Sequence, residues 1–194
     1  DPVMGLIVDN TKTKFGKFKP WIAFGAFTSG ILTILLFSDF KVSGSAYTVF
    51  FAVVYLLWGI TFTTNDISYW SMLPALSVDQ KEREKIGAVA RLCANIGLFS
   101  VVASIVPLTA FLSNKTGSLT KAYFVFAVIT VISMWLTQSI TLIGVIEPKI
   151  TKEQNRTTLT ELLHIIAGND QLIFTAVLMT LFMTGYTTTT GFGL

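Results

Sequence analysis

Little charge, one cysteine and one histidine are the first features of this sequence. Only 13% of its 194 residues are charged, whereas soluble domains carry roughly 25% charged residues. The single cysteine, Cys93, excludes an internal disulfide framework and a cysteine-rich metal site. The single histidine, His164, excludes a zinc site built on paired histidines and leaves one possible base for a Ser-His-Asp set. A glycine-rich phosphate loop is also absent, so we do not expect an enzyme.

Long apolar runs take the place of these features. Hydrophobic residues make up 52% of the chain, and its mean hydropathy is +0.67. About 20 consecutive apolar residues are enough to cross a bilayer. We therefore predict an all-α polytopic membrane protein with five spans and one partial span. The predicted helical segments are 1–8, 21–38, 46–76, 87–112, 122–146 and 171–194.

Basic residues alternate between the predicted loops. Ten Lys and Arg residues fall in segments 9–20, 77–86 and 147–170, and three fall in the alternate loops. By the positive-inside rule, the first set of loops is predicted to be cytoplasmic. The net charge of +3 therefore reflects loop residues and does not indicate binding of nucleic acid.

One loop segment is long enough to contain structure of its own. Thr158 and Glu161 have the spacing of a capping box, and four apolar residues follow at helical spacing: Leu159, Leu162, Leu163 and Ile166. This pattern predicts a short amphipathic helix at the membrane surface. Both ends of the chain fall within predicted helices, and we expect it to be a fragment of a longer protein.

Asp66 is an acid inside an apolar segment, where a carboxylate costs about 2.5–3.5 kcal/mol on insertion scales. At about 100° per residue, Thr63, Asp66 and Trp70 share one helix face. Helix rise places Asp66 roughly 16 Å, Asp1 roughly 12 Å and Arg91 roughly 8 Å from the predicted cytoplasmic ends of their helices. These three ionisable groups therefore predict a polar site in one slab of the membrane.

The residues alone leave several alternatives open. Asp66 has a transport role or serves as a structural partner of Arg91. Asp1 shares the transport role or, since its predicted helix is cut short, has only a structural or artefactual one; two carboxylates together could hold a cation or share a proton. Trp70 stacks on a substrate or is an interfacial aromatic.

Three stretches match a known family pattern. They are residues 1–21, which run from Asp1-Pro2-Val3-Met4-Gly5 to Lys19-Pro20-Trp21, residues 66–84, which open with Asp66-Ile67-Ser68-Tyr69-Trp70, and Asn169-Asp170-Gln171. Together they closely resemble the glycoside-pentoside-hexuronide:cation symporters, the melibiose-permease-like branch of the major facilitator superfamily. The resemblance implies a twelve-helix transporter, of which this chain covers the end of helix 2 through helix 7. It also implies that 1–146 belongs to an N-terminal bundle, 147–170 is a cytoplasmic middle loop and 171–194 begins the C-terminal bundle.

The resemblance also implies roles for individual residues. The coupling cation would bind Asp1, Thr63 and Asp66. If that cation is a metal ion, the resemblance implies Na⁺. The sugar would contact Asp66, Trp70 and Arg91. A cytoplasmic gating motif would include Gly5, Asp9, Gly16, Lys17 and Arg83. Ser68 departs from the family, which usually has proline there, so a kink at this position is not expected.

The function expected from these observations is cation-coupled symport of a glycoside, pentoside or related sugar. The coupling cation is expected to be Na⁺, H⁺ or Li⁺, without a further cofactor, because carboxylates and a hydroxyl suit all three. The expected partners are the sugar and membrane lipid, with no nucleic acid; the sequence leaves open a partner protein that regulates transport. The expected location is the bacterial cytoplasmic membrane. The alternatives are a symporter of lysolipids or other amphiphiles and a membrane sensor or scaffold that does not transport.

Two hypotheses follow for the mechanism. If Asp66 serves both ligands, cation binding neutralises a cluster of acids and orients the carboxylate for the sugar, so each ligand raises the affinity of the other. Separately, Asp9 is expected to pair with Arg83 or with a loop lysine and to hold the cytoplasmic side closed.

Overall fold

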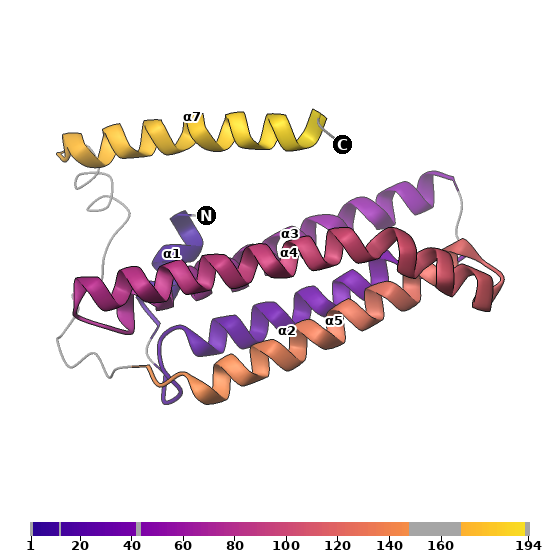
Figure 1. Cartoon of the computed structure of the whole chain (residues 1–194), viewed down its shortest axis with the longest axis horizontal. Coiled ribbons are helices and arrows are strands. Elements are labelled where there is room, and N and C mark those ends of the chain that lie inside the picture. Colours follow the sequence, from indigo (N-terminus) through magenta and orange to yellow (C-terminus); the bar gives the residue numbers. More distant parts are fainter. Residues whose placement is uncertain (1, 12, 42–43, 148–167, 193–194) are drawn as a thin grey trace. The chain divides into compact units, whose positions relative to one another are not determined.

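The computed structural model describes residues 2–11, 13–41, 44–147 and 168–192. Within these ranges the regular secondary structure is entirely helical, as the sequence predicts (Figure 1). The helices are α1 (Pro2–Asp9), α2 (Lys19–Leu36), α3 (Ser45–Ala75), α4 (Gln80–Thr116), α5 (Leu119–Gly144) and α7 (Asp170–Phe192). The chain divides into two units, residues 1–151 and 152–194, and α7 is the described helix of the second unit.

Five of these helices are long and apolar enough to cross a membrane: α2, α3, α4, α5 and residues 170–189 of α7. They correspond to the five spans predicted from apolar length. Pro20 lies in the first turn of α2, where its missing N–H costs no hydrogen bond. The predicted surface helix at 158–166 and His164 lie outside the described residues.

The start of α4 corrects the sequence prediction. Residues 79–85 were expected to form a loop, but α4 begins at Gln80. Asp79 is its N-cap, and its side chain accepts a hydrogen bond from the backbone N–H of Lys81 at 3.3 Å. Lys, Glu and Arg are good helix formers, so a capped charged segment extends a membrane helix into water. Arg91 therefore lies eleven residues, or roughly 16 Å of helix rise, from the true helix start.

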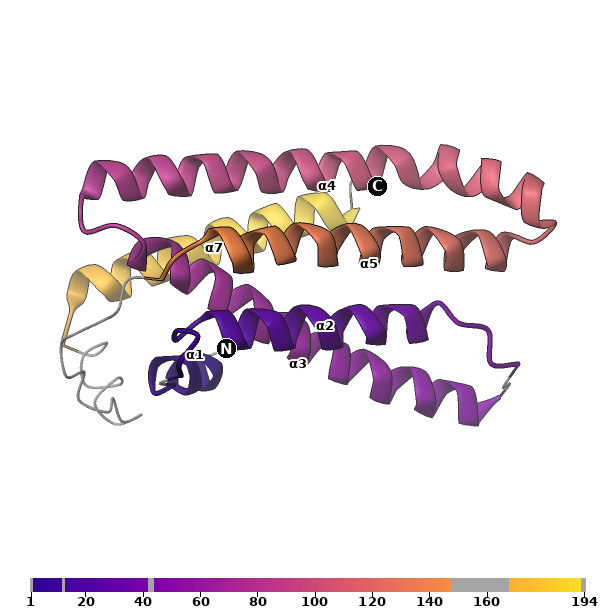
Figure 2. The same cartoon turned by 90° about the horizontal axis from the view of Figure 1, so that it is seen from below.

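Small residues allow the helices of the first unit to approach closely. In that unit, α2 lies beside α3 and α5, and α4 lies beside α5 (Figure 2). A Cβ atom added at Gly25 would lie 2.6 Å from the backbone nitrogen of Asn65, and one added at Gly30 would lie 2.6 Å from Nε1 of Trp135. That indole donates a hydrogen bond to the carbonyl of Ala26 at 3.0 Å. Glycine at these positions therefore permits helix contact, as is common between membrane helices.

The buried core of this unit lies where α1, α2 and the end of α3 meet, together with the end of α5. Val8, Phe18, Ile22 and Met72 form it, and Leu142 of α5 packs against it. By the predicted orientation this is the cytoplasmic end. The core anchors the loop between α1 and α2, which carries two of the five predicted gating residues, Gly16 and Lys17.

Candidate functional site

Asp66 and Trp70 are joined directly on α3. The indole Nε1 of Trp70 donates a hydrogen bond to Oδ1 of Asp66 at 2.9 Å. The two residues are four apart, so the helix places them one above the other. Asp66 is exposed and Trp70 is half-buried within the described structure. The other carboxylate oxygen of Asp66, Oδ2, has no hydrogen-bond partner among the described residues, which leaves an acceptor for a ligand.

Arg91 brings a positive charge from α4 to the same place. Its guanidinium carbon lies 4.9 Å from the centroid of the Trp70 ring, within the range of a cation–π contact. In the described part of the chain, Asp66 and Arg91 form no ion pair with each other, so Trp70 is the residue that links them. A carboxylate, an indole and a guanidinium from two helices thus make one polar cluster.

The predicted cation site is described only in part. Thr63 lies on α3 one turn before Asp66 and is half-buried, but Asp1 lies outside the described residues. The described residues contain no cluster of three or more His, Cys, Asp or Glu that could hold a metal ion. The carboxylate and hydroxyl oxygens of Asp66 and Thr63 are the hard donors that an alkali cation prefers.

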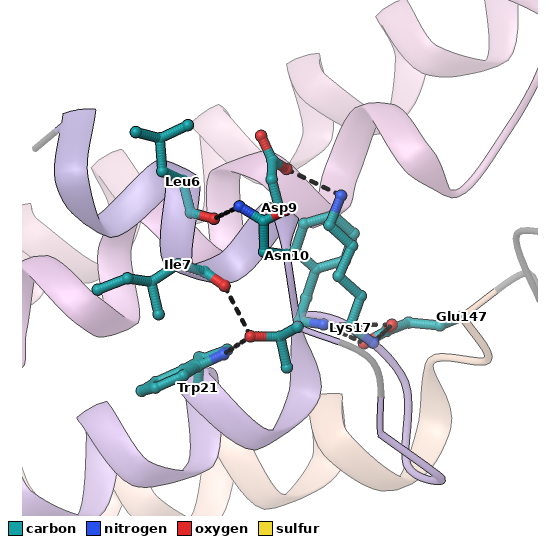
Figure 3. A network of polar contacts seen from close by, with 9 residues as sticks. Leu6, Ile7, Asp9, Asn10, Lys17, Trp21 and Glu147 are labelled. Carbon is teal, nitrogen blue, oxygen red and sulfur yellow. Dashed lines mark hydrogen bonds and ion pairs between the residues drawn. The ribbon is translucent and has the colours of Figure 1, made fainter. Parts of the chain in front are cut away.

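The predicted gating residues lie on α1, in the loop that follows it and on α4. Nζ of Lys17 forms an ion pair with Oδ1 of Asp9 at 2.8 Å, so the structure pairs Asp9 with a loop lysine (Figure 3). Arg83 lies exposed in the first turns of α4. A Cβ atom at Gly5 would meet nothing within 4 Å, whereas Gly16 adopts a φ of +111° beside Glu147. The gating role of these residues stays a prediction.

Glu147 is a residue that sequence reasoning missed. Its carboxylate accepts hydrogen bonds from the backbone N–H of Lys17 at 2.7 Å (Figure 3) and from that of Lys19 at 2.8 Å. The sequence shows only an acid shortly after an apolar run, in a segment read as a polar linker. A contact across 130 positions has no local signal, so the sequence could not identify this one.

Trp21 also makes a specific contact beside the predicted gate. Its Nε1 donates to Oγ1 of Thr11 at 2.8 Å. The Thr11 hydroxyl in turn donates to the carbonyl of Ile7 at 2.7 Å (Figure 3). Trp21 therefore ties α2 to the end of α1 beside the Asp9–Lys17 pair.

Comparison with known proteins identifies the family of this chain. The model of the MFS/sugar transport protein family matches residues 1–193. The chain belongs to this family. It is 35% identical to a lactose permease of Lactobacillus delbrueckii subsp. bulgaricus, over 91% of this chain and 30% of that protein. It is 33% identical to the raffinose carrier protein of Pediococcus pentosaceus, over 91% of this chain and 29% of that protein.

A further relative is named as a symporter. The chain is 37% identical to the uncharacterized symporter YnaJ of Bacillus subtilis, over 61% of this chain and 26% of that protein. The chain thus spans about a third or less of the length of these relatives. Five helices able to cross a membrane and bacterial permeases as relatives identify a multi-pass protein of the cell membrane.

Proposed function

We propose that this sugar transport family member carries out cation-coupled symport of a glycoside or related sugar, with Na⁺ or H⁺ as the coupling ion. The observation that supports this most is the Asp66–Trp70–Arg91 cluster. Its indole has an apolar face for a pyranose ring, and its two charged groups can bind sugar hydroxyls. The proposal assigns the protein transport without covalent chemistry.

Within the cluster, each residue contributes differently to binding. The carboxylate of Asp66 accepts hydrogen bonds from sugar hydroxyls, and the guanidinium of Arg91 donates to them. Trp70 stacks on the ring and holds Oδ1 of Asp66 in place through its indole N–H. Because Oδ1 already accepts the indole N–H, Oδ2 has more acceptor capacity left for a ligand.

The coupling ion would act on the same carboxylate. Asp66 with Thr63, and with Asp1 from outside the described residues, would hold a Na⁺ ion or share a proton. Binding of the cation would offset the cost of a carboxylate in the membrane and orient it for the sugar. Each ligand then raises the affinity of the other by the same factor.

The names of the relatives supply the first sugars to test. Uptake of radiolabelled lactose, raffinose and other glycosides is measured in vesicles that contain the full-length parent, with and without imposed Na⁺ or H⁺ gradients. Gradient-driven accumulation of one sugar is expected. If the inserted protein accumulates no sugar under either gradient, the proposal fails, and a panel of lysolipids then tests transport of amphiphiles.

Asp66→Asn tests the site itself. Hydrogen bonds to a charged group contribute about 1.5–3 kcal/mol each, which corresponds to roughly 10–100-fold in affinity. The variant is expected to lose gradient-driven uptake and the stimulation of sugar binding by the cation. A variant that keeps both activities would show that Asp66 is not shared by the two ligands.

A further inference from the structure

Glu147 follows α5 in the sequence, yet its carboxylate lies at the start of α2. Its two oxygens accept N–H groups from three successive residues: Lys17 at 2.7 Å, Phe18 at 3.2 and 3.3 Å, and Lys19 at 2.8 Å. Phe18 is the N-cap of α2, and its side chain makes no capping hydrogen bond. The first N–H groups of a helix have no intrahelical partner and carry partial positive charge. Glu147 therefore caps α2 from a distant part of the chain.

Gly16 makes this close approach possible. Its φ of +111° lies in the region that favours glycine, and an added Cβ atom would lie 2.6 Å from Cδ of Glu147 and still nearer to Oε2. Backbone conformation and space therefore both require glycine here. A side chain at position 16 would displace the carboxylate from the N–H groups.

Lys17 connects this cap to the predicted gate. Its backbone N–H bonds to Glu147, and its Nζ pairs with Asp9 at the end of α1 (Figure 3). The Lys17 side chain is only 13% exposed, so its path to Asp9 is restricted by its surroundings. Fixing the Lys17 backbone therefore fixes the position from which its ammonium reaches Asp9.

We propose that Glu147 is a positioning residue of the transport cycle. Its carboxylate attaches the loop between α1 and α2 to the end of α5. By fixing the Lys17 backbone, it positions the Lys17 ammonium for its ion pair with Asp9. This inference rests on the proposed transport function and adds a third residue to the Asp9–Lys17 pair. The contact is partly buried at a helix end. When the loop moves, water can therefore form hydrogen bonds to the carboxylate and to the backbone N–H groups.

The test uses Glu147→Gln and Glu147→Asp in the full-length parent. The amide of Gln keeps one acceptor oxygen but loses the charge, while Asp keeps the charge on a shorter arm. Glu84→Gln is the matched control, because Glu84 is exposed on α4 and accepts from Gln80 at 3.0 Å. Lactose affinity is measured by equilibrium binding, and the maximal rate is measured by uptake into vesicles.

We expect Glu147→Gln to lower the maximal uptake rate by about tenfold or more while the lactose Kd stays within about twofold, since hydrogen bonds to a charged group contribute about 1.5–3 kcal/mol. Glu147→Asp is expected to recover part of the rate, and Glu84→Gln to match the parent. An unchanged rate in Glu147→Gln would overturn the proposal. The proposal would also be overturned if the uptake rate and the number of lactose-binding sites both fell in proportion to the amount of folded protein.

A second measurement needs no sugar. Thr13, an exposed residue of the loop, is replaced by cysteine in a Cys93→Ser background, and labelling by an impermeant maleimide is followed in inside-out vesicles. We expect labelling to be about fivefold faster or more with Glu147→Gln and with Gly16→Ala. Gly44→Ala is the control, because Gly44 also has a positive φ of 74° but has nothing within 4 Å of an added Cβ atom.

The two measurements separate the possible failures. If the parent transports sugar but labelling is equal in all variants, the attachment by Glu147 is wrong. If labelling rises in Glu147→Gln but the parent transports no sugar, the attachment exists and the proposed function fails, and with it the role of Glu147 in transport.

Discussion

The indole of Trp70 donates a hydrogen bond to the carboxylate of Asp66 at 2.9 Å, one turn earlier on α3. The same indole lies under the guanidinium of Arg91 from α4. Trp70 thus provides more than a stacking surface, since its N–H fixes one carboxylate oxygen of Asp66 and its ring contacts the guanidinium of Arg91. This arrangement separates the tasks of the three residues and allows each to be tested alone.

Replacement of Trp70 by Phe removes the indole N–H and keeps an aromatic face. A hydrogen bond to a charged group contributes about 1.5–3 kcal/mol, so we expect the Kd for sugar to rise by roughly tenfold or more. Stimulation of binding by the coupling cation should also weaken, because Asp66 loses the contact that orients it. Equilibrium binding with and without Na⁺ measures both effects. A Trp70→Phe variant with the parent's affinity would show that stacking alone matters.

Replacement of Arg91 by Lys keeps the positive charge but loses the planar guanidinium. Cation–π contacts of this kind contribute about 0.5–2 kcal/mol, and Lys cannot donate in the same fork. We expect sugar affinity to fall by about fivefold, and further in Arg91→Gln.

Lys115 provides the matched control for Arg91. It lies 4.8 Å from the Phe111 ring centroid near the other end of α4. Lys115→Gln also removes a cation–π contact, so it should leave sugar affinity unchanged. Equal losses in Arg91→Lys and Lys115→Gln would indicate a general effect on α4.

Charge reversal at the Asp9–Lys17 pair tests the gate. Asp9→Lys places two cations together and should lower the transport rate by about tenfold or more, with little change in sugar affinity. The double variant Asp9→Lys with Lys17→Asp restores opposite charges and should recover part of the rate. Initial rates of uptake and equilibrium binding provide the comparison. A double variant no better than the single one would mean that the pair does not act as a unit.

The glycine contacts between helices allow a prediction about stability. Gly25→Ala would push a methyl group against the backbone of Asn65, and overpacking of this kind costs about 1–3 kcal/mol. The apparent Tm in detergent should therefore fall. Gly59→Ala is the control, because nothing lies within 4 Å of its added Cβ atom and alanine favours helix by about 0.5–1 kcal/mol. A Gly25→Ala variant as stable as Gly59→Ala would contradict the close approach of α2 and α3.

Much of the fold could be predicted because membrane spans are local features. Apolar length alone located α2, α3, α5 and α7, and the period of a helix placed Asp66 and Trp70 on one face. The start of α4 differs from the prediction, which places a loop over the charged residues 79–85. In fact Asp79 caps the helix, and the charged residues that follow it are helix formers.

Local sequence specifies what each segment can be: which runs can cross the membrane, and where an acid lies inside an apolar run at a cost in free energy. Solvation and helix period act over a few turns, so neighbouring residues carry that information. Which distant groups come into contact depends on the tertiary fold, as for Arg91 with Trp70 and Glu147 with the start of α2. These contacts depend on how separate helices pack against one another, and the residues involved lie up to 130 positions apart in the sequence.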